Sequence, residues 1–284
     1  MRTEQEMMEL ILDFAKEDSR VRLVTLEGSR ANKNIPRDTF QDFDISYFVT
    51  NIDSFKKNDD WLSFFGKRLM MQKPEDMELF PPELGGWYSY LMLFQDGNRL
   101  DLKLIPLEDV EDYFSTSDGL VKVILDKDRL VKTNVNPSDE QYWIKRPTAR
   151  EFDDCCNEFW WVSTYVVKGL ARKEILYAID HLNWHVRPNL LRMLAWKVGL
   201  EKGFTFSIGK NYKYIEHCLP KEDWKLLMST YSQVNYAKVW ESLFTCYKLF
   251  RKYSKTVAED LTYQYPNYDK AISEYTQQIF HTWA

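Results

Sequence analysis

The spacing of apolar residues changes once along this chain of 284 residues, between residues 142 and 147. Before that point, short stretches alternate apolar and polar residues, which is the pattern of strands that bury one face. After it, apolar residues recur every three or four positions, as at Phe159, Val162 and Val166, which is typical of amphipathic helices. The sequence therefore predicts a mixed α+β domain over residues 1–145 and a helical bundle over residues 146–284.

The first domain is expected to begin with a helix, because Thr3 and Glu6 have the spacing of a capping box. Thr148 and Glu151 repeat that spacing at the start of the helical domain. Between these two points the pattern predicts strands over residues 22–27, 41–49, 87–94, 99–105 and 121–125, and helices near residues 59–71 and 108–114.

Two carboxylates share one face of the strand expected over residues 41–49. Apolar residues occupy every second position from Phe43 to Val49, and Asp42 and Asp44 fall on the opposite face. Because side chains two residues apart in a strand point the same way, both carboxylates are directed at one point. Neighbouring carboxylates repel each other, and Mg²⁺ prefers such oxygen ligands. The strand therefore predicts a site for a divalent metal ion.

A third carboxylate, Asp101, lies in the alternating stretch over residues 99–105, on the face opposite to its leucines. This stretch is the second arm of an expected hairpin, whose turn contains Asp96-Gly97. Gly28 and Ser29 end the strand expected over residues 22–27. A glycine allows close approach of the backbone to a ligand, and successive N–H groups at such a turn bind phosphate oxygens.

The ordered set of Gly28-Ser29, Asp42-x-Asp44 and a later strand aspartate resembles the nucleotidyltransferase superfamily, which has a polymerase-β-like fold. Residues 26–31 and 41–46 together resemble the aminoglycoside 6-adenylyltransferases, which inactivate streptomycin. The likeness continues through residues 99–103, 125–128 and 157–174. It implies transfer of AMP from ATP to a streptomycin hydroxyl, with two Mg²⁺ ions, release of pyrophosphate and antibiotic resistance as the outcome.

The resemblance also implies roles for individual residues. Asp42, Asp44 and Asp101 are the expected catalytic and metal-binding carboxylates, with Asp101 as general base and Glu158 as the reserve candidate for that role. Gly28, Ser29 and Arg30 are expected to bind nucleotide phosphates. Lys168 matches a phosphate-contacting lysine of related enzymes, and Arg172 lies four residues later on the same helix face. On the residues alone, a solvated basic stripe is the favoured interpretation of Lys168 and Arg172, and it is the resemblance that points to a phosphate contact for Lys168.

Other residues have two interpretations. Glu158 and Trp161 are candidates for binding the aminoglycoside, but a surface acid and a core aromatic are the plain structural alternatives. His181 and His185 have a spacing used by zinc sites, yet the sequence offers no third ligand. A second Asp-x-Asp motif, at residues 126–128, has no glycine turn before it, and we expect a solvated turn there.

A net charge of −5 argues against a nucleic-acid partner and suits a cationic substrate. The four cysteines show no metal-binding spacing, and the N-terminus lacks the pattern of a signal peptide. We therefore expect a cytoplasmic protein, a monomer or weak dimer, that binds no membrane, and the resemblance implies ATP and streptomycin as its small-molecule substrates. Two alternatives stay open. One is transfer to another acceptor, such as a lincosamide, a different aminoglycoside or a protein. The other is a nucleotide-binding relative without activity.

Overall fold

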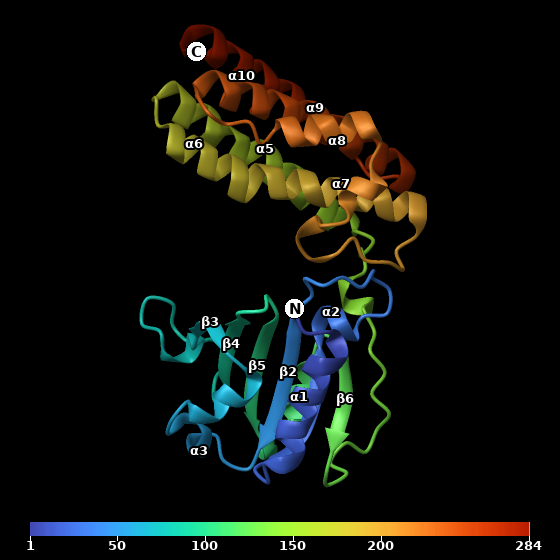
Figure 1. The fold of residues 1–284 in the computed structure, drawn as a ribbon. Helices are drawn as coiled ribbons and strands as arrows, with labels where there is room; N and C mark the ends of the chain where they lie inside the picture. Colours follow the sequence, from blue (N-terminus) through green and yellow to red (C-terminus); the bar gives the residue numbers. More distant parts are fainter. Residues whose placement is uncertain (284) are drawn as a thin grey trace. The chain divides into compact units, whose positions relative to one another are not determined.

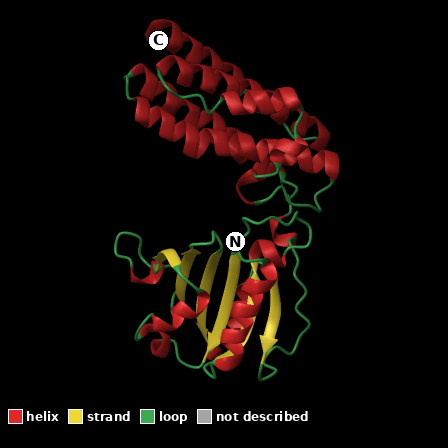
Figure 2. Cartoon of the chain, in the orientation of Figure 1, coloured by secondary structure: helices red, strands yellow, loops and turns green. Residues whose placement is uncertain are grey.

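The computed structural model describes residues 1–283, which form two compact units. The first unit ends at Gln141 and contains a sheet with helices, and the second begins at Tyr142 and is helical (Figure 1, Figure 2). The predicted succession of a mixed sheet and a helical region is thus confirmed.

The first unit is built on a six-stranded sheet with the strand order β3-β4-β5-β2-β1-β6. The central pair, β2 and β5, is parallel, and the other neighbours are antiparallel. The strands are β1 (Val21–Glu27), β2 (Phe43–Val49), β3 (Arg68–Gln72), β4 (Tyr88–Phe94), β5 (Arg99–Pro106) and β6 (Val121–Asp126).

Helices cover both faces of this sheet. On one face lies α1 (Glu4–Glu17) (Figure 1). It buries Met7 and Ile11 against the apolar side chains of the strands, and the capping box at Thr3 is present. On the other face Tyr113 of α4 (Val110–Thr116) packs on Phe48. The remaining short helical segments are α2 (Gly28–Ala31), α3 (Asp53–Lys56), η1 (Asp60–Phe65), η2 (Pro74–Asp76), η3 (Leu107–Asp109) and η4 (Glu140–Tyr142).

The helix predicted near residues 59–71 is wrong in its second half. A 3₁₀ segment, η1, ends before Gly66, whose φ of 108° interrupts any helix. The chain then becomes β3 and pairs with β4, and Leu69 is 63% exposed in this strand. Pairing with a distant strand overrides the helical spacing of the apolar residues here.

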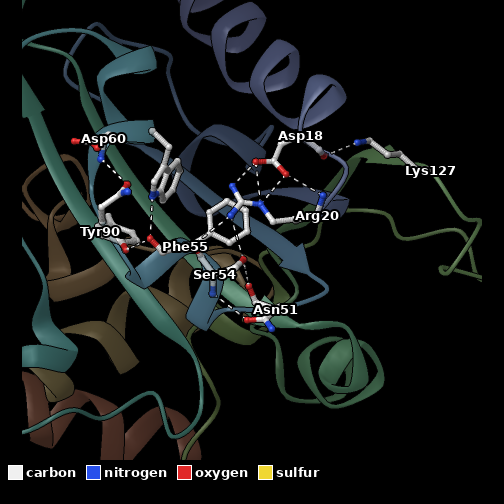
Figure 3. A network of polar contacts seen from close by, with 10 residues as sticks. Asp18, Arg20, Asn51, Ser54, Phe55, Asp60, Tyr90 and Lys127 are labelled. Atoms are coloured by element: carbon white, nitrogen blue, oxygen red, sulfur yellow. Dashed lines mark hydrogen bonds and ion pairs between the residues drawn. The ribbon is translucent and has the colours of Figure 1, made fainter.

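A polar network fixes the end of the sheet at which β1 begins (Figure 3). The Arg20 guanidinium donates to the Asp18 carboxylate at 2.6 Å and to the Ser54 carbonyl oxygen at 3.2 Å, and it lies 3.7 Å above the Phe55 ring. Lys127, which follows β6, donates to the Asp18 carbonyl oxygen at 3.0 Å. These contacts tie α1, α3 and β6 together.

The second unit consists of packed helices around one apolar core. They are α5 (Ala149–Ala171), α6 (Ile175–His181), the π-helical η5 (Leu182–Val186), α7 (Arg187–Lys202), η6 (Lys210–Tyr212), η7 (Ile215–Cys218), α8 (Lys221–Ser229), α9 (Tyr236–Leu261) and α10 (Tyr268–Trp283). The predicted capping box at Thr148 and Glu151 begins α5. Within residues 1–283, no helix combines the length and the apolar content that crossing a membrane requires.

Candidate active site

Three carboxylates form a row across the middle of the sheet. Asp44 on β2 pairs in register with Asp101 on the parallel strand β5 and with Glu27 on the antiparallel strand β1. Residues paired in this way carry their side chains on the same face of a sheet, about 5 Å apart. Asp42 precedes β2 by one residue and shares this end of the sheet. The register thus gathers Asp42, Asp44 and Asp101, as the sequence predicts, and adds Glu27.

The turn after β1 approaches this row closely. Gly28 has a φ of +62°, and a Cβ atom built on it would lie 2.6 Å from Oδ2 of Asp44. Its N–H donates to the Leu120 carbonyl oxygen at 3.0 Å, which continues the pairing of β1 with the segment before β6. Ser29 follows in α2, and its carbonyl oxygen accepts a bond of 3.4 Å from the Gln41 side-chain amide. A side chain at position 28 would be strained by the positive φ and would displace the Asp44 carboxylate or the turn, so glycine suits this position.

Arg30 lies beneath the loop that leads into β2. Its side chain is only 4% exposed. Its guanidinium donates to the carbonyl oxygens of Gln41 at 2.8 Å and Asp42 at 3.0 Å, pairs with Glu4 at 2.9 Å, and lies 3.8 Å above the Phe43 ring. These contacts engage the guanidinium with protein groups, and a phosphate contact by Arg30 stays a prediction.

A second row of polar side chains supports Glu27. Lys103 lies two residues after Asp101 on β5, pairs in register with Ser46 of β2, and donates to the Glu27 carboxylate at 2.9 Å. The Ser46 hydroxyl donates to the other oxygen of Glu27. Glu27 therefore has an internal counter-charge, whereas Asp44 in the same row has no hydrogen-bonding cation of its own among the described residues.

The electrostatics of the site follow from burial and from like charges. Burial raises the pKa of Asp44 to about 7, and the neighbouring charges of Asp101, Asp42 and Glu27 add to this increase, while Lys103 opposes it. Burial also raises the pKa of Asp42, against the effect of Arg99. A site that disfavours carboxylate charge in this way is relieved by a bound cation.

The donor set fits Mg²⁺ in its chemistry, since it offers several carboxylate oxygens. Within residues 1–283, no three acidic, histidine or cysteine side chains stand in an arrangement ready to hold a metal ion. At the edge of the row, the Arg99 guanidinium pairs with both Asp42 and Asp101. A cation of the protein thus already contacts two of the predicted metal ligands.

The predicted residues of the second unit lie along α5. Trp161 is 59% exposed and is therefore not a core aromatic, whereas its neighbour Trp160 belongs to the core. The Trp161 indole N–H donates to the Tyr165 hydroxyl at 3.2 Å. The Lys168 ammonium lies 4.7 Å from the centre of the Tyr165 ring, and Arg172 is exposed at the C-terminal end of α5.

Glu158 also belongs to this helix. Its carboxylate lies 3.8 Å from Nδ1 of His185, whose ring centre is 5.7 Å from that of His181. Nδ1 of His181 lies 2.8 Å from the Tyr177 carbonyl oxygen. This local bonding gives the two histidines structural partners.

Comparison with known proteins identifies the family. The family model described as "Streptomycin adenylyltransferase" matches residues 1–279. This chain belongs to the streptomycin adenylyltransferase family. It is 68% identical to the aminoglycoside 6-adenylyltransferase of Bacillus subtilis (strain 168), over 99% of each chain. It is 57% identical to the enzyme of the same name from Campylobacter jejuni, over 97% of this chain and 95% of the relative. A crystal structure of an aminoglycoside 6-adenyltransferase from B. subtilis covers 99% of each chain, with 63% identity and a TM-score of 0.49.

Three polar residues that lie at the site were not predicted as site residues from the sequence. Glu27 comes directly before Gly28, and this position next to the predicted turn could have marked it as a candidate. Its place in the carboxylate row, however, depends on the register between β1 and β2. Lys103 could have been found from its spacing, because it lies two residues from Asp101 and therefore on the same face of the strand. Arg99 has the same spacing on the other side of Asp101.

Proposed function

We propose that this chain is an adenylyltransferase that transfers AMP from ATP to a hydroxyl of streptomycin and thereby confers resistance to it. Membership in the streptomycin adenylyltransferase family supports the reaction and the substrate class. One observation links the proposed reaction to particular residues: Asp44 pairs in register with Asp101, and Asp42 and the Gly28 turn lie beside them. This arrangement offers oxygen ligands for metal ions next to a turn that accommodates phosphate.

The bond changes assign a role to each part of the site. The hydroxyl oxygen of the acceptor forms a bond to the α-phosphorus of ATP, the bond between that phosphorus and the bridging oxygen to the β-phosphate breaks, and pyrophosphate leaves. Asp42, Asp44 and Asp101 would hold Mg²⁺, which supplies positive charge to the phosphate oxygens when bound. Asp101 is our candidate to accept the hydroxyl proton, with Glu158 in reserve.

The turn at Gly28 and Ser29 binds phosphate oxygens, and Arg30 holds the Asp42 segment in place.

We assign to the helical unit the binding of the aminoglycoside and of the leaving pyrophosphate. Trp161 presents an exposed ring and Glu158 an exposed carboxylate on α5, and both favour a substrate that carries guanidinium groups. Lys168 and Arg172 supply positive charge for pyrophosphate. The assignment rests on exposure and chemistry within this unit.

The test is release of pyrophosphate from ATP with Mg²⁺, measured with and without streptomycin. We expect release that depends on streptomycin, and loss of it in Asp42→Asn and Asp44→Asn with the fold retained. Asp128→Asn is the matched control, because Asp128 belongs to the second Asp-x-Asp motif of the same sheet and pairs with Arg22 at 2.6 Å. Near-normal turnover in Asp42→Asn contradicts the assignment of Asp42 to the active site. Pyrophosphate release that occurs with a lincosamide or another aminoglycoside, but not with streptomycin, changes the acceptor and keeps the reaction. ATP binding with no pyrophosphate release in the presence of any acceptor contradicts the proposed activity.

A further inference from the structure

Arg99 is the first residue of β5, and its side chain contacts two carboxylates of the site. Its Nε lies 3.0 Å from Oδ1 of Asp101, and a terminal nitrogen donates to Oδ2 of the same carboxylate at 3.1 Å. The same Nε lies 3.7 Å from Oδ2 of Asp42. Arg99 therefore engages both oxygens of Asp101 and pairs with Asp42 at once.

The two cations of the site are held differently. Lys103 is mostly buried and is hydrogen-bonded to Glu27, a carboxylate outside the predicted metal ligands. The Arg99 side chain is 46% exposed, and the contacts described for it go only to the two predicted metal ligands. An exposed ion pair contributes little to stability, so a guanidinium in this position leaves readily when a stronger partner for the carboxylates arrives.

We propose that Arg99 is a positioning residue that competes with the divalent metal ion for Asp42 and Asp101 and is displaced when metal and nucleotide bind together. The inference rests on the proposed function, because it takes Asp42 and Asp101 as metal ligands. It has two consequences. Metal alone binds weakly, because it must displace a positive charge. Once released, the guanidinium is available to the polyphosphate of ATP, for which its planar donor pattern is suited.

The first experiment measures binding of Mn²⁺ alone to the full-length protein, in the absence of nucleotide, by titration calorimetry. Arg99→Met keeps the apolar stem and removes the charge, and we expect its Mn²⁺ dissociation constant to fall between about two- and tenfold. Arg22→Met is the matched control, because Arg22 forms a comparable exposed pair with Asp128 on the same sheet, away from the metal ligands. We expect wild-type Mn²⁺ affinity in that control.

The second readout separates this role from a purely structural one. At saturating metal, Arg99→Met is expected to raise KM for ATP severalfold and to leave KM for streptomycin unchanged. Should Arg99→Met fold poorly, Arg99→Gln removes the same charge with a polar side chain and takes its place.

The outcomes distinguish this inference from the proposed function. Wild-type Mn²⁺ affinity in Arg99→Met, with binding still abolished by Asp42→Asn, overturns the competition and leaves the metal site intact. Mn²⁺ binding that survives both Asp42→Asn and Asp101→Asn overturns the metal site itself, and the competition with it.

Discussion

Gly28 and Asp44 approach each other so closely that a Cβ atom on residue 28 would lie 2.6 Å from Oδ2 of Asp44. Real side chains do not tolerate this separation, so either the turn or the carboxylate must move when residue 28 gains a side chain. The site thus depends on the absence of a single carbon atom at the end of β1.

Gly28→Ala is expected to reduce turnover by about a hundredfold, since a displacement of about 1 Å at a catalytic group has effects of this size. The left-handed φ of residue 28 adds a stability cost of about 1–2 kcal/mol. Gly85→Ala is the matched control, because Gly85 has a φ of +65° but no atom within 4 Å of the place that a Cβ would take. Activity assays and thermal unfolding of both variants separate the two effects. Equal activity losses in the two variants contradict the close-approach argument.

Arg30 supports the segment that carries Asp42. Arg30→Met is expected to lower the free energy of unfolding by about 2–3 kcal/mol, because the carbonyl oxygens of Gln41 and Asp42 lose their donors in a largely buried place. We also expect weaker Mn²⁺ binding, since the Asp42 backbone is no longer held. Chemical denaturation and metal titration check both effects. Arg37→Met serves as the control, because Arg37 is exposed and lies 3.9 Å from the same Glu4; a cost as large in that variant contradicts the assignment.

Asp269 gives the helical unit a stability that depends on pH. Burial alone would raise its pKa, but hydrogen bonds from Arg251, Tyr265 and Ser273 outweigh burial and hold the pKa below its usual value. A carboxyl whose pKa is lower in the folded state stabilises the fold above its unfolded pKa, about 3.9, and loses that contribution as the pH falls through the folded pKa.

Asp269→Asn is therefore expected to cost about 2–4 kcal/mol of unfolding free energy near neutral pH, since it breaks a partly buried ion pair. The difference from wild type should shrink as the pH falls from about 4, where the unfolded wild-type chain begins to bind the proton, through the lower folded pKa, where the native carboxyl binds it too. Urea denaturation of wild type and Asp269→Asn, at neutral pH and at pH values below about 4, measures this difference in unfolding free energy. Asp260→Asn removes an exposed partner of Lys197 and should show a much smaller difference. A difference for Asp269→Asn that stays constant with pH excludes this linkage.

The carboxylates of the site were predictable because alternation along a strand is a local property. Asp42, Asp44 and Asp101 follow from counting residues within single strands. Glu27 does not, since its place in the row follows from the pairing of β1 with β2. Lys103 shares the face of Asp101 by the same counting, but its bond to Glu27 depends on the pairing of β1, β2 and β5, which joins residues far apart in the sequence.

Two other features show where local patterns are insufficient. The helix expected near residues 59–71 fails because β3 gains its hydrogen bonds from β4, about twenty residues further along the chain. For Arg30 the sequence predicts a phosphate contact, which stays a prediction, and only the folded chain shows that its guanidinium is buried and donates to two carbonyl oxygens. Burial of a charged side chain depends on partners that the sequence does not place next to it.

Trp161 tests the assignment of the aminoglycoside to α5. Trp161→Ala is expected to raise KM for streptomycin about three- to thirtyfold, the range that a cation–π contact with a guanidinium group provides. KM for ATP should stay within twofold, about the scatter of such comparisons. Trp283→Ala is the control, because Trp283 is a comparably exposed tryptophan on α10, and the bond from Lys173 uses its main-chain carbonyl oxygen. Steady-state kinetics with each substrate varied in turn separates the two constants. An unchanged KM for streptomycin in Trp161→Ala moves the aminoglycoside away from this face of α5, because an exposed ring that contacts the substrate cannot be removed without loss of affinity.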